Sequence, residues 1–203
     1  HKDWTPDLEK NKTQPDDPFK PYGATPGHGI EWARLITQWA LSTQEHVVDA
    51  QKSAGGQHAA DAAFSAQPYI EAAEQLFTRA IADAWCADGE RGIVYTTDWN
   101  GNPVVHDRMH WTLMEAINTS AVLYRVTGKD AYAARYAEFM AYMEEVVHDP
   151  VHGSFYHQLD EHNQVKGTVW PGKSDLYHAF QAMLIPYGDP AVSVASDVAR
   201  KKA

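Results

Sequence analysis

Three histidines stand near the expected starts of three helices: His28, His110 and His178. The N-terminus of a helix carries a partial positive charge, which disfavours the imidazolium form of a histidine placed there. Such a histidine tends to stay neutral at pH 7, and a neutral imidazole can accept a proton from carbon. Any one of the three could equally be a cap or a packing residue. Their recurrence at comparable positions favours general acid–base chemistry.

Carboxylates and an aromatic ring accompany these histidines. Glu31 follows His28 by three residues on the same helix face, where it could orient the imidazole or bind a hydroxyl group. Trp111 and Glu115 are four residues apart, which places a ring and a carboxylate on one face. A core tryptophan and solvated glutamates would give the same pattern, so the residues alone leave both interpretations open.

A metal site is the more specific alternative to acid–base catalysis by the histidines. The chain has 11 histidines, and His28-x-x-Glu31 has the spacing of metal ligands on a helix. His106 and His110 are also four residues apart, but His106 precedes the expected helix. The sequence contains neither an HExxH motif nor a cysteine pair. We therefore predict no metal and no other cofactor, and keep metal catalysis as a minority interpretation.

Apolar residues at helical spacing predict the elements that position these side chains. The first helix is expected over about 29–45, and Pro68 suits the first turn of a second helix that runs through Ala84. Gly55-Gly56 lies in a polar break between them. Further helices are expected over about 108–126, closed by Gly128, over about 130–147 and over about 174–185, with a weak helix at the end.

Two short hairpins separate the later helices. The first runs from Gly92–Tyr95 through Asn100-Gly101 and back through Val104-Val105, and the second begins at Gly153–Tyr156. Aligned without gaps, the two copies match at Gly92 and Gly153, Tyr95 and Tyr156, Asn102 and Asn163, and Val104 and Val165. This internal repeat predicts an all-α array of helix pairs with short hairpins between them.

Composition limits the organisation and the partners. A chain of 203 residues suits one domain, here with a loop over 1–27, helical repeats over 28–187 and a tail over 188–203. The net charge of −10, with both signs mixed along the chain, argues against a nucleic-acid partner. No apolar run is long enough to cross a membrane. Cys86 is the single cysteine, which fits a cytoplasmic location.

Three segments resemble the N-acylglucosamine 2-epimerase superfamily. The stretch from Pro26 to Leu35, PGHGIEWARL, resembles its PGHxxEWxxLL signature. Asp107 to Trp111, with Glu115 after it, resembles the DRMHWxxxE segment, and Lys173 to Ala179 resembles the KxDxYHA segment. The last two segments are most similar to the D-mannose isomerase and aldose–ketose isomerase branch.

The resemblance implies an (α/α)6 barrel of twelve helices, of which this chain corresponds to the C-terminal half. It also implies a sugar pocket at one end of the barrel and a cofactor-independent reaction through a cis-enediolate. The family's catalytic histidines match His28 and His178, supported by Glu31, and its substrate-binding residues match Arg108, His110, Trp111 and Glu115. We assign the proton-shuttling base to His178, and ring opening and the second acid–base role to His28.

The expected function is therefore that of an isomerase that interconverts an aldose and a ketose of the mannose and fructose type. Two alternatives stay open: a 2-epimerase acting on N-acylglucosamine or cellobiose, and a carbohydrate-binding α/α repeat without catalysis. The chain starts at His1 without an initiator methionine, as a fragment would. Half a barrel leaves an inner face uncovered, so we expect a missing N-terminal half, a second chain or self-association to cover it, and the fragment alone could be inactive.

Overall fold

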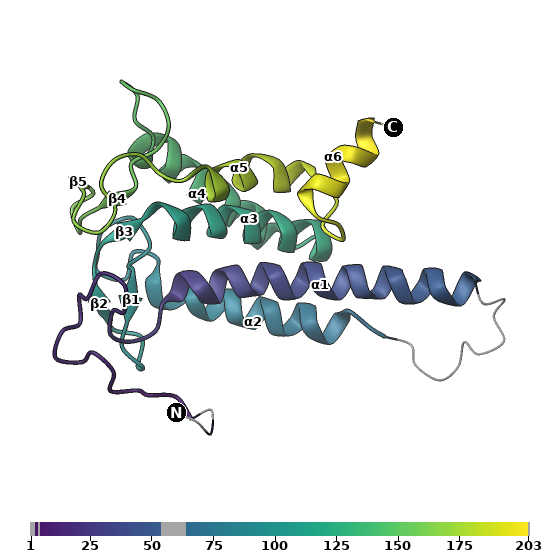
Figure 1. Cartoon of the computed structure of the whole chain (residues 1–203), viewed down its shortest axis with the longest axis horizontal. Coiled ribbons are helices and arrows are strands. Elements are labelled where there is room, and N and C mark those ends of the chain that lie inside the picture. The colour runs from purple at the N-terminus through teal and green to yellow at the C-terminus, as the bar shows by residue number, and fades with distance from the viewer. Residues whose placement is uncertain (1–2, 4, 54–63, 203) are drawn as a thin grey trace.

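The computed structural model describes residue 3, residues 5–53 and residues 64–202. This part of the chain is mostly helical, and its few strands are short and gather at one end of the molecule (Figure 1). Among the described residues, none of the helices combines the length and the apolarity that a membrane span requires. The predicted break at Gly55-Gly56 lies outside the described residues.

The helices form two layers. The inner layer consists of α1 (Pro26–Ser53), α3 (His110–Thr127) and α5 (Leu176–Leu184), in which α3 packs against both neighbours. The outer layer consists of α2 (Gln67–Ala84), packed on α1, and α4 (Asp130–Tyr142), packed on α3. All three inner helices begin at the end where the strands gather (Figure 1). Side chains in their first turns are therefore brought to one edge, as the repeat predicts.

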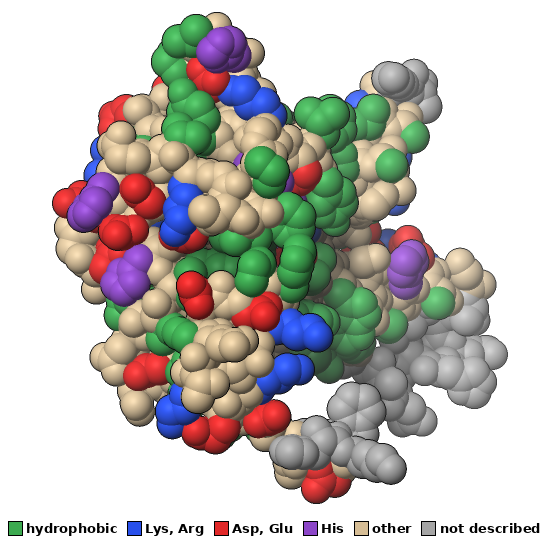
Figure 2. Space-filling model, turned by 60° about the vertical axis from the view of Figure 1, so that its left-hand side comes forward, with side chains coloured by type: hydrophobic (Ala, Val, Ile, Leu, Met, Phe, Trp, Pro, Cys, Tyr) green, Lys and Arg blue, Asp and Glu red, His purple; other side chains and the backbone are tan. Residues whose placement is uncertain are grey.

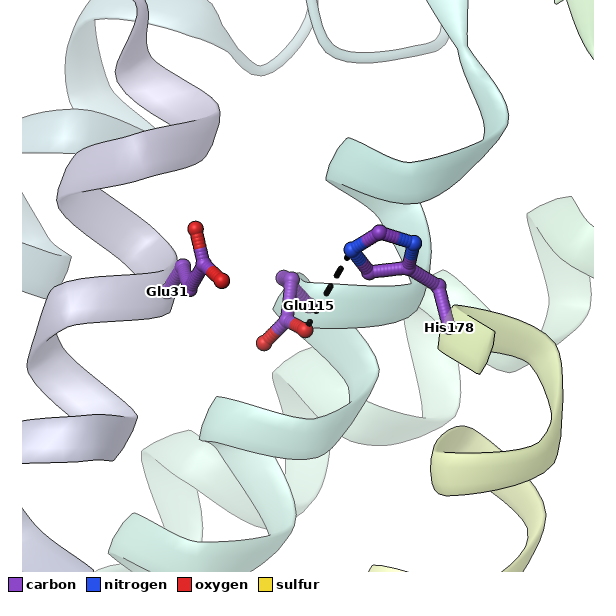
Figure 3. Close-up of side chains that lie close together, drawn as sticks. All are labelled: Glu31, Glu115 and His178. Atoms are coloured by element: carbon purple, nitrogen blue, oxygen red, sulfur yellow. Dashed lines mark ion pairs between the residues drawn. The ribbon is translucent and has the colours of Figure 1, made fainter. Parts of the chain in front are cut away.

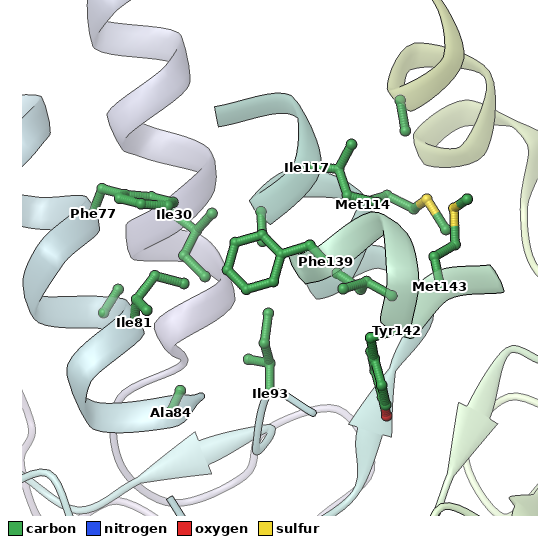
Figure 4. Close-up of a cluster of buried hydrophobic side chains, with 14 of the residues drawn as sticks. Ile30, Phe77, Ile81, Ala84, Ile93, Met114, Ile117, Phe139, Tyr142 and Met143 are labelled. Atoms are coloured by element: carbon green, nitrogen blue, oxygen red, sulfur yellow. The ribbon is translucent and has the colours of Figure 1, made fainter. Parts of the chain in front are cut away.

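The core lies between the two layers. Figure 4 shows Ile30 of α1, Phe77 of α2, Ile117 of α3 and Phe139 of α4 pointing into one cluster, and each is almost fully buried. Along α3 every residue from Thr112 to Leu123 is buried. A helix surrounded in this way must accept polar side chains in the interior, and this is how α3 carries a carboxylate to the site.

The start of α1 is set by a close approach to α3. Pro26 occupies the first position of α1. Proline suits this position, because a backbone N–H in the first turn of a helix has no acceptor within the helix. A Cβ atom on Gly27 would lie 2.5 Å from the side chain of Thr112 and 2.8 Å from that of Trp111. Glycine at this position lets the first turn of α1 lie directly against the first turn of α3.

The strands form two small antiparallel sheets. One pairs β1 (Thr96–Thr97) with β2 (Pro103–Val105). The other contains β3 (Arg108–Met109), β4 (Gln158–Leu159) and β5 (Val165–Lys166), with β4 in the middle. Both hairpins are present as predicted, but their first strands begin later than expected. Residues of the predicted strands form only isolated bridges: Trp85 to Ile93, His148 to Phe155 and Tyr156 to Lys173.

The internal repeat is present, with an offset one residue longer than in the gap-free alignment. In the first hairpin Oδ1 of Asp98 accepts the N–H groups of Asn100 and Asn102, at 2.9 Å each. In the second, Oδ1 of Asp160 accepts those of His162 and Gln164, at 2.9 and 2.8 Å. The turn residues with positive φ are Gly101 (89°) and Asn163 (61°). The gap-free match of Asn102 with Asn163 was therefore wrong, because the two asparagines occupy different turn positions.

The ends of the later helices lie close to the predicted positions, but α1 extends beyond the predicted 29–45 at both ends, from Pro26 to Ser53. Gly128 ends α3 in the left-handed conformation, with φ 67°, and its N–H donates to the carbonyl of Tyr124. A π-helical turn, Met143–Val147, continues α4. A 3-10 turn, Ile185–Tyr187, follows α5, and α6 (Val194–Lys202) lies within the predicted tail.

One side of the inner layer is uncovered. Several large apolar side chains on α1 and α5 are exposed there, among them Leu35 at 38% and Phe180 at 62%. A groove of about 1070 Å³ runs between α1 on one side and α5 and α6 on the other. Figure 2 shows hydrophobic side chains gathered beside the hairpin end, whose own surface mixes acidic and basic groups.

Candidate active site

Side chains from all three inner helices meet at the hairpin end. Figure 3 shows Glu31 of α1, Glu115 of α3 and His178 of α5 directed toward a common space. One ligand atom from each lies within 4.8 Å of the other two. Nε2 of His178 is 4.0 Å from Oε1 of Glu115. The structure thus brings together three of the predicted site residues, which lie far apart in the sequence.

His28 lies at the edge of this cluster. Its Nδ1 is 3.2 Å from Oε2 of Glu31, and 63% of its side chain is exposed. An ionised carboxylate can only accept a hydrogen bond, so this contact requires the proton on Nδ1 of His28. In the neutral imidazole the other nitrogen, Nε2, is then an acceptor. Glu31 therefore orients His28, one of the roles that the spacing predicts.

Trp111 lies close to both histidines. The centroid of its ring system is 4.9 Å from that of His28 and 5.9 Å from that of His178. Tyr95 approaches the same ring edge-on at 6.4 Å. Unlike the residues from Thr112 to Leu123, Trp111 is only partly buried. A flat ring with two imidazoles close to it can stack against the C–H face of a small polyhydroxylated molecule.

His178 is held by the residue that caps its helix. Oδ1 of Asp175, the N-cap of α5, accepts a hydrogen bond from the backbone N–H of His178 at 2.9 Å. The same oxygen lies 3.1 Å from Nδ1 of the imidazole. Asp175 is within the segment that carries the family resemblance, but it was not predicted as a site residue. The signal that could have indicated it is its spacing, three residues before His178 at a helix start.

Glu115 is fully buried and paired with an arginine that the sequence analysis also missed. Arg34 donates from Nε to Oε2 of Glu115 at 2.8 Å and from Nη2 to Oε1 at 3.0 Å. It donates a further bond to Gln38 at 2.9 Å. This two-pronged ion pair compensates the burial of the Glu115 carboxylate and fixes its orientation. Arg34 is three residues after Glu31, on the same helix face.

The donor set suits an organic ligand better than a metal ion. A cation bound by Glu31, Glu115 and His178 would lie beside the guanidinium of Arg34, which already occupies both oxygens of Glu115. Like charges at this distance repel strongly in a partly buried site. The predicted independence of metal agrees with this arrangement, although it remains a prediction.

His110 does not lie in the cluster as predicted. It is the first residue of α3, whereas His28 and His178 are the third residues of their helices. Two positions differ by about 200° around a helix axis, so His110 points to another side. Its ring is 2% exposed and stacks on Phe155, with centroids 5.6 Å apart. Burial lowers the pKa of His110 to about 4, so it is a neutral core residue and not an exposed sugar ligand.

Arg108 is also removed from the predicted sugar contact. Its guanidinium forms two hydrogen bonds of 2.7 Å to Asp88, and its other N–H groups donate to the carbonyls of Glu90, Arg91 and His106. Burial alone would raise the pKa of Asp88, but the hydrogen bonds from Arg108 and His106 lower it to about 2. With all its donors engaged, Arg108 stabilises the loop before the first hairpin and has none left for a ligand.

Fold and site together define an α/α-repeat protein in which two carboxylate-bound histidines lie close to a tryptophan. Residues 1–182 match the model of the N-acylglucosamine 2-epimerase (GlcNAc 2-epimerase) family. The chain belongs to this family.

Two curated relatives are D-mannose isomerases. That of Pseudomonas cannabina pv. alisalensis is 40% identical over 196 residues, and that of Thermobifida fusca is 37% identical over 198 residues. Each alignment covers 97% of this chain but only 44% of the relative, so the chain spans less than half the length of these proteins.

Solved structures show the same fold over part of their length. A crystal structure of D-mannose isomerase matches with a TM-score of 0.68 and 23% identity, over 91% of this chain and 41% of that protein. Cellobiose 2-epimerase from Bacillus thermoamylovorans B4167 matches with a TM-score of 0.57 and 13% identity, over 78% of this chain and 38% of that protein. The described helices therefore match part of the (α/α)6 barrels of the family.

Proposed function

We propose that this chain carries the histidine side of a sugar isomerase site that interconverts an aldose and a ketose of the mannose and fructose type. The single observation that carries the proposal is the pair of histidines, His28 and His178, each bound through Nδ1 to a carboxylate and each with its ring close to that of Trp111. The D-mannose isomerase relatives, aligned along nearly the whole chain, support this substrate class.

The geometry supports proton transfer by two bases. His28 first opens the sugar ring. With the open-chain sugar on Trp111, His178 removes the proton from C2 and delivers it to C1, while Nε2 of His28 accepts the proton of the C2 hydroxyl and passes it to O1. The carbonyl group thereby moves from C1 to C2 through a cis-enediolate. Glu115, fully buried and fixed by Arg34, supplies a negative charge beside Nε2 of His178. No step requires a metal or an organic cofactor.

A 2-epimerase is the second candidate, because the matching family model is named for that activity. The two reactions share the cis-enediolate and differ only in where the proton returns: to C1 in an isomerase, and to the opposite face of C2 in an epimerase. A carbohydrate-binding repeat without catalysis is the third candidate. It is favoured by the openness of the site, in which the His28 side chain is 63% exposed.

The proposal also includes a cover over the open face of the inner layer. The uncovered face of α1 and α5, with Leu35 and Phe180, adjoins the candidate site through Arg34. Covering this face with the remaining helices of a barrel would bury the apolar groove and close the site from water. The cover is a longer form of the same protein, a second chain or a second copy.

Product analysis tests the proposed function. The assembled barrel, incubated with D-mannose, should form D-fructose, whereas an epimerase would form D-glucose. His178→Asn should reduce the rate by at least ~10²-fold, and His162→Asn, at an exposed hairpin position, should leave it unchanged. Binding of mannose without either product would contradict the proposal and favour the carbohydrate-binding alternative.

A further inference from the structure

Asp175 contacts His178 in two ways through one oxygen. Its Oδ1 accepts the backbone N–H that begins α5, at 2.9 Å, and lies 3.1 Å from Nδ1 of the ring. The other oxygen, Oδ2, is 3.3 Å from the same Nδ1. The backbone bond fixes the carboxylate relative to the helix, and the fixed carboxylate in turn fixes the imidazole. The orientation of the His178 ring is therefore coupled to the helix start.

The contact determines which nitrogen of His178 carries the proton. Burial alone would raise the pKa of Asp175, but the hydrogen bonds from the backbone and ring of His178 lower it, so the carboxylate is ionised at neutral pH. An ionised carboxylate can only accept. Nδ1 must therefore be the donor, and Nε2 of the neutral ring is left as a proton acceptor.

Nε2 faces the common space of the site. It is 4.0 Å from Oε1 of Glu115, beyond hydrogen-bond distance. Both oxygens of Glu115 already accept bonds from Arg34, which reduces the pull of that carboxylate on a proton at Nε2. Glu31 from α1 completes the charged surroundings on this side.

On its other side Asp175 faces a second histidine that cannot replace the first. Nδ1 of His110 is 4.0 Å from Oδ2 of Asp175, and neither ring nitrogen of His110 has a hydrogen-bond partner among the described residues. Because His110 is buried and neutral, it does not compete with His178 for the Asp175 carboxylate.

We propose that Asp175 is the positioning residue of His178: it keeps the proton on Nδ1 and thereby presents Nε2 as the atom that accepts the proton of the substrate. The identity of the substrate proton rests on the proposed function. The tautomer of His178, and the role of Asp175 in fixing it, do not rest on the proposed function. Both follow from hydrogen bonds within the chain.

Nitrogen NMR of the 15N-histidine-labelled full chain tests the tautomer directly. The signals of His178 are identified by their loss in His178→Asn. They should show a protonated Nδ1 and an unprotonated Nε2 near neutral pH. Asp175→Ser keeps a good N-cap for α5 but removes the acceptor for the ring, and should shift the signals toward a mixture of tautomers. Asp175→Asn keeps an acceptor oxygen and should retain the wild-type pattern.

Asp160→Ser is the matched control, because Oδ1 of Asp160 also accepts two backbone N–H groups but no imidazole bond. It should leave the His178 signals unchanged. A wild-type His178 with its proton on Nε2 would overturn the proposal. So would an unchanged pattern in Asp175→Ser, which would reduce Asp175 to a helix cap.

Kinetics of the assembled barrel supply the second measurement. Asp175→Ser should lower kcat by ~10–100-fold, the range seen when a hydrogen-bond partner of a working histidine is removed, with little change in KM. Asp175→Asn should restore part of that loss. Equal kcat values for Asp175→Ser and the wild type would overturn the positioning role. The predicted tautomers in a barrel that forms neither product would support the role of Asp175 while contradicting the proposed function.

Discussion

His28 and His178 share one hydrogen-bonding pattern at the residue scale. Each imidazole is bound through Nδ1 to a carboxylate three residues away, Glu31 after His28 and Asp175 before His178. The pattern leaves the two Nε2 atoms as the available acceptors near the tryptophan. Beneath them, Glu115 is held in place by Arg34. Two of these six residues, Asp175 and Arg34, were not predicted as site residues from the sequence.

The pair between Arg34 and Glu115 should contribute strongly to stability. Arg34→Met leaves a fully buried carboxylate without a partner, and should lower the free energy of unfolding by about 3–5 kcal/mol. Urea denaturation measures this. Arg79→Met breaks an exposed pair with Asp83 in α2 and should cost no more than about 0.5 kcal/mol. Equal losses in the two variants would contradict the structural role of the buried pair.

The buried His110 should make stability depend on pH. Its pKa rises from about 4 in the folded chain to its usual 6.5 on unfolding, so the unfolded state binds the proton more tightly. The contribution is therefore fully present above pH 6.5 and is lost as pH falls toward 4, by up to about 3 kcal/mol.

Denaturation between pH 4 and pH 7 checks this prediction. His110→Phe keeps a ring against Phe155 but removes the titrating group, and should lose less stability on acidification than the wild type does. His162→Phe, at an exposed position, should follow the wild type. Parallel curves for the wild type and His110→Phe would be inconsistent with a buried neutral His110.

At the scale of the elements, the first turn of α1 positions half of the site. Gly27→Ala would place a methyl group 2.5 Å from Thr112 and 2.8 Å from Trp111, so α1 must move away from α3. We expect a loss of about 1–3 kcal/mol in the free energy of unfolding and weaker sugar binding. Gly29→Ala is the matched control in the same helix: its Cβ would meet only Ala80 and Leu76 at ordinary contact distances, and should be neutral or stabilising. Similar losses for both glycines would refute the close-approach explanation.

The sequence predicts the elements well where the signals are local. Helical periodicity and terminal residues such as Gly128 place most helices within a few residues, because both depend on neighbours in the chain. The exception is α1, which ends at Ser53 instead of about residue 45. The positions of the very short strands are predicted less well, because two residues are too few to show an alternation of apolar and polar side chains. The alignment of the two hairpins was wrong because it matched Asn102 with Asn163 by residue type. Residue type alone does not show which position of a turn has a positive φ.

The site is predictable to a similar degree. His28, Glu31, Trp111, Glu115 and His178 come together as expected, because equivalent starts of paired helices lie at the same edge. The partner of Glu115 is 81 residues away in the sequence, so no local pattern could indicate it. The displacement of His110 depends on the exact first residue of α3. Helix boundaries at that resolution follow from packing and not from periodicity.

On the scale of the whole molecule, the uncovered face of the inner layer should promote association. The exposed Leu35 and Phe180 line an open apolar groove, and such exposed apolar surface is typical of an interaction site. The isolated chain should therefore sediment as a concentration-dependent oligomer or bind a hydrophobic dye. Phe180→Glu should reduce both effects, whereas Val151→Glu, at an exposed position of a loop, should not. A stable dilute monomer without dye binding would contradict the expectation of a missing cover.

The central claim, that His178 moves the proton at C2, is tested most directly by solvent deuterium incorporation at C2 of the sugar in the assembled barrel. The wild type should exchange this proton, because Nε2 of His178 removes it and shares it with water. His178→Asn should lower the exchange rate by at least ~10²-fold while sugar binding persists, since Trp111 and the hydroxyl contacts remain. Exchange at the wild-type rate in His178→Asn would show that another residue is the base.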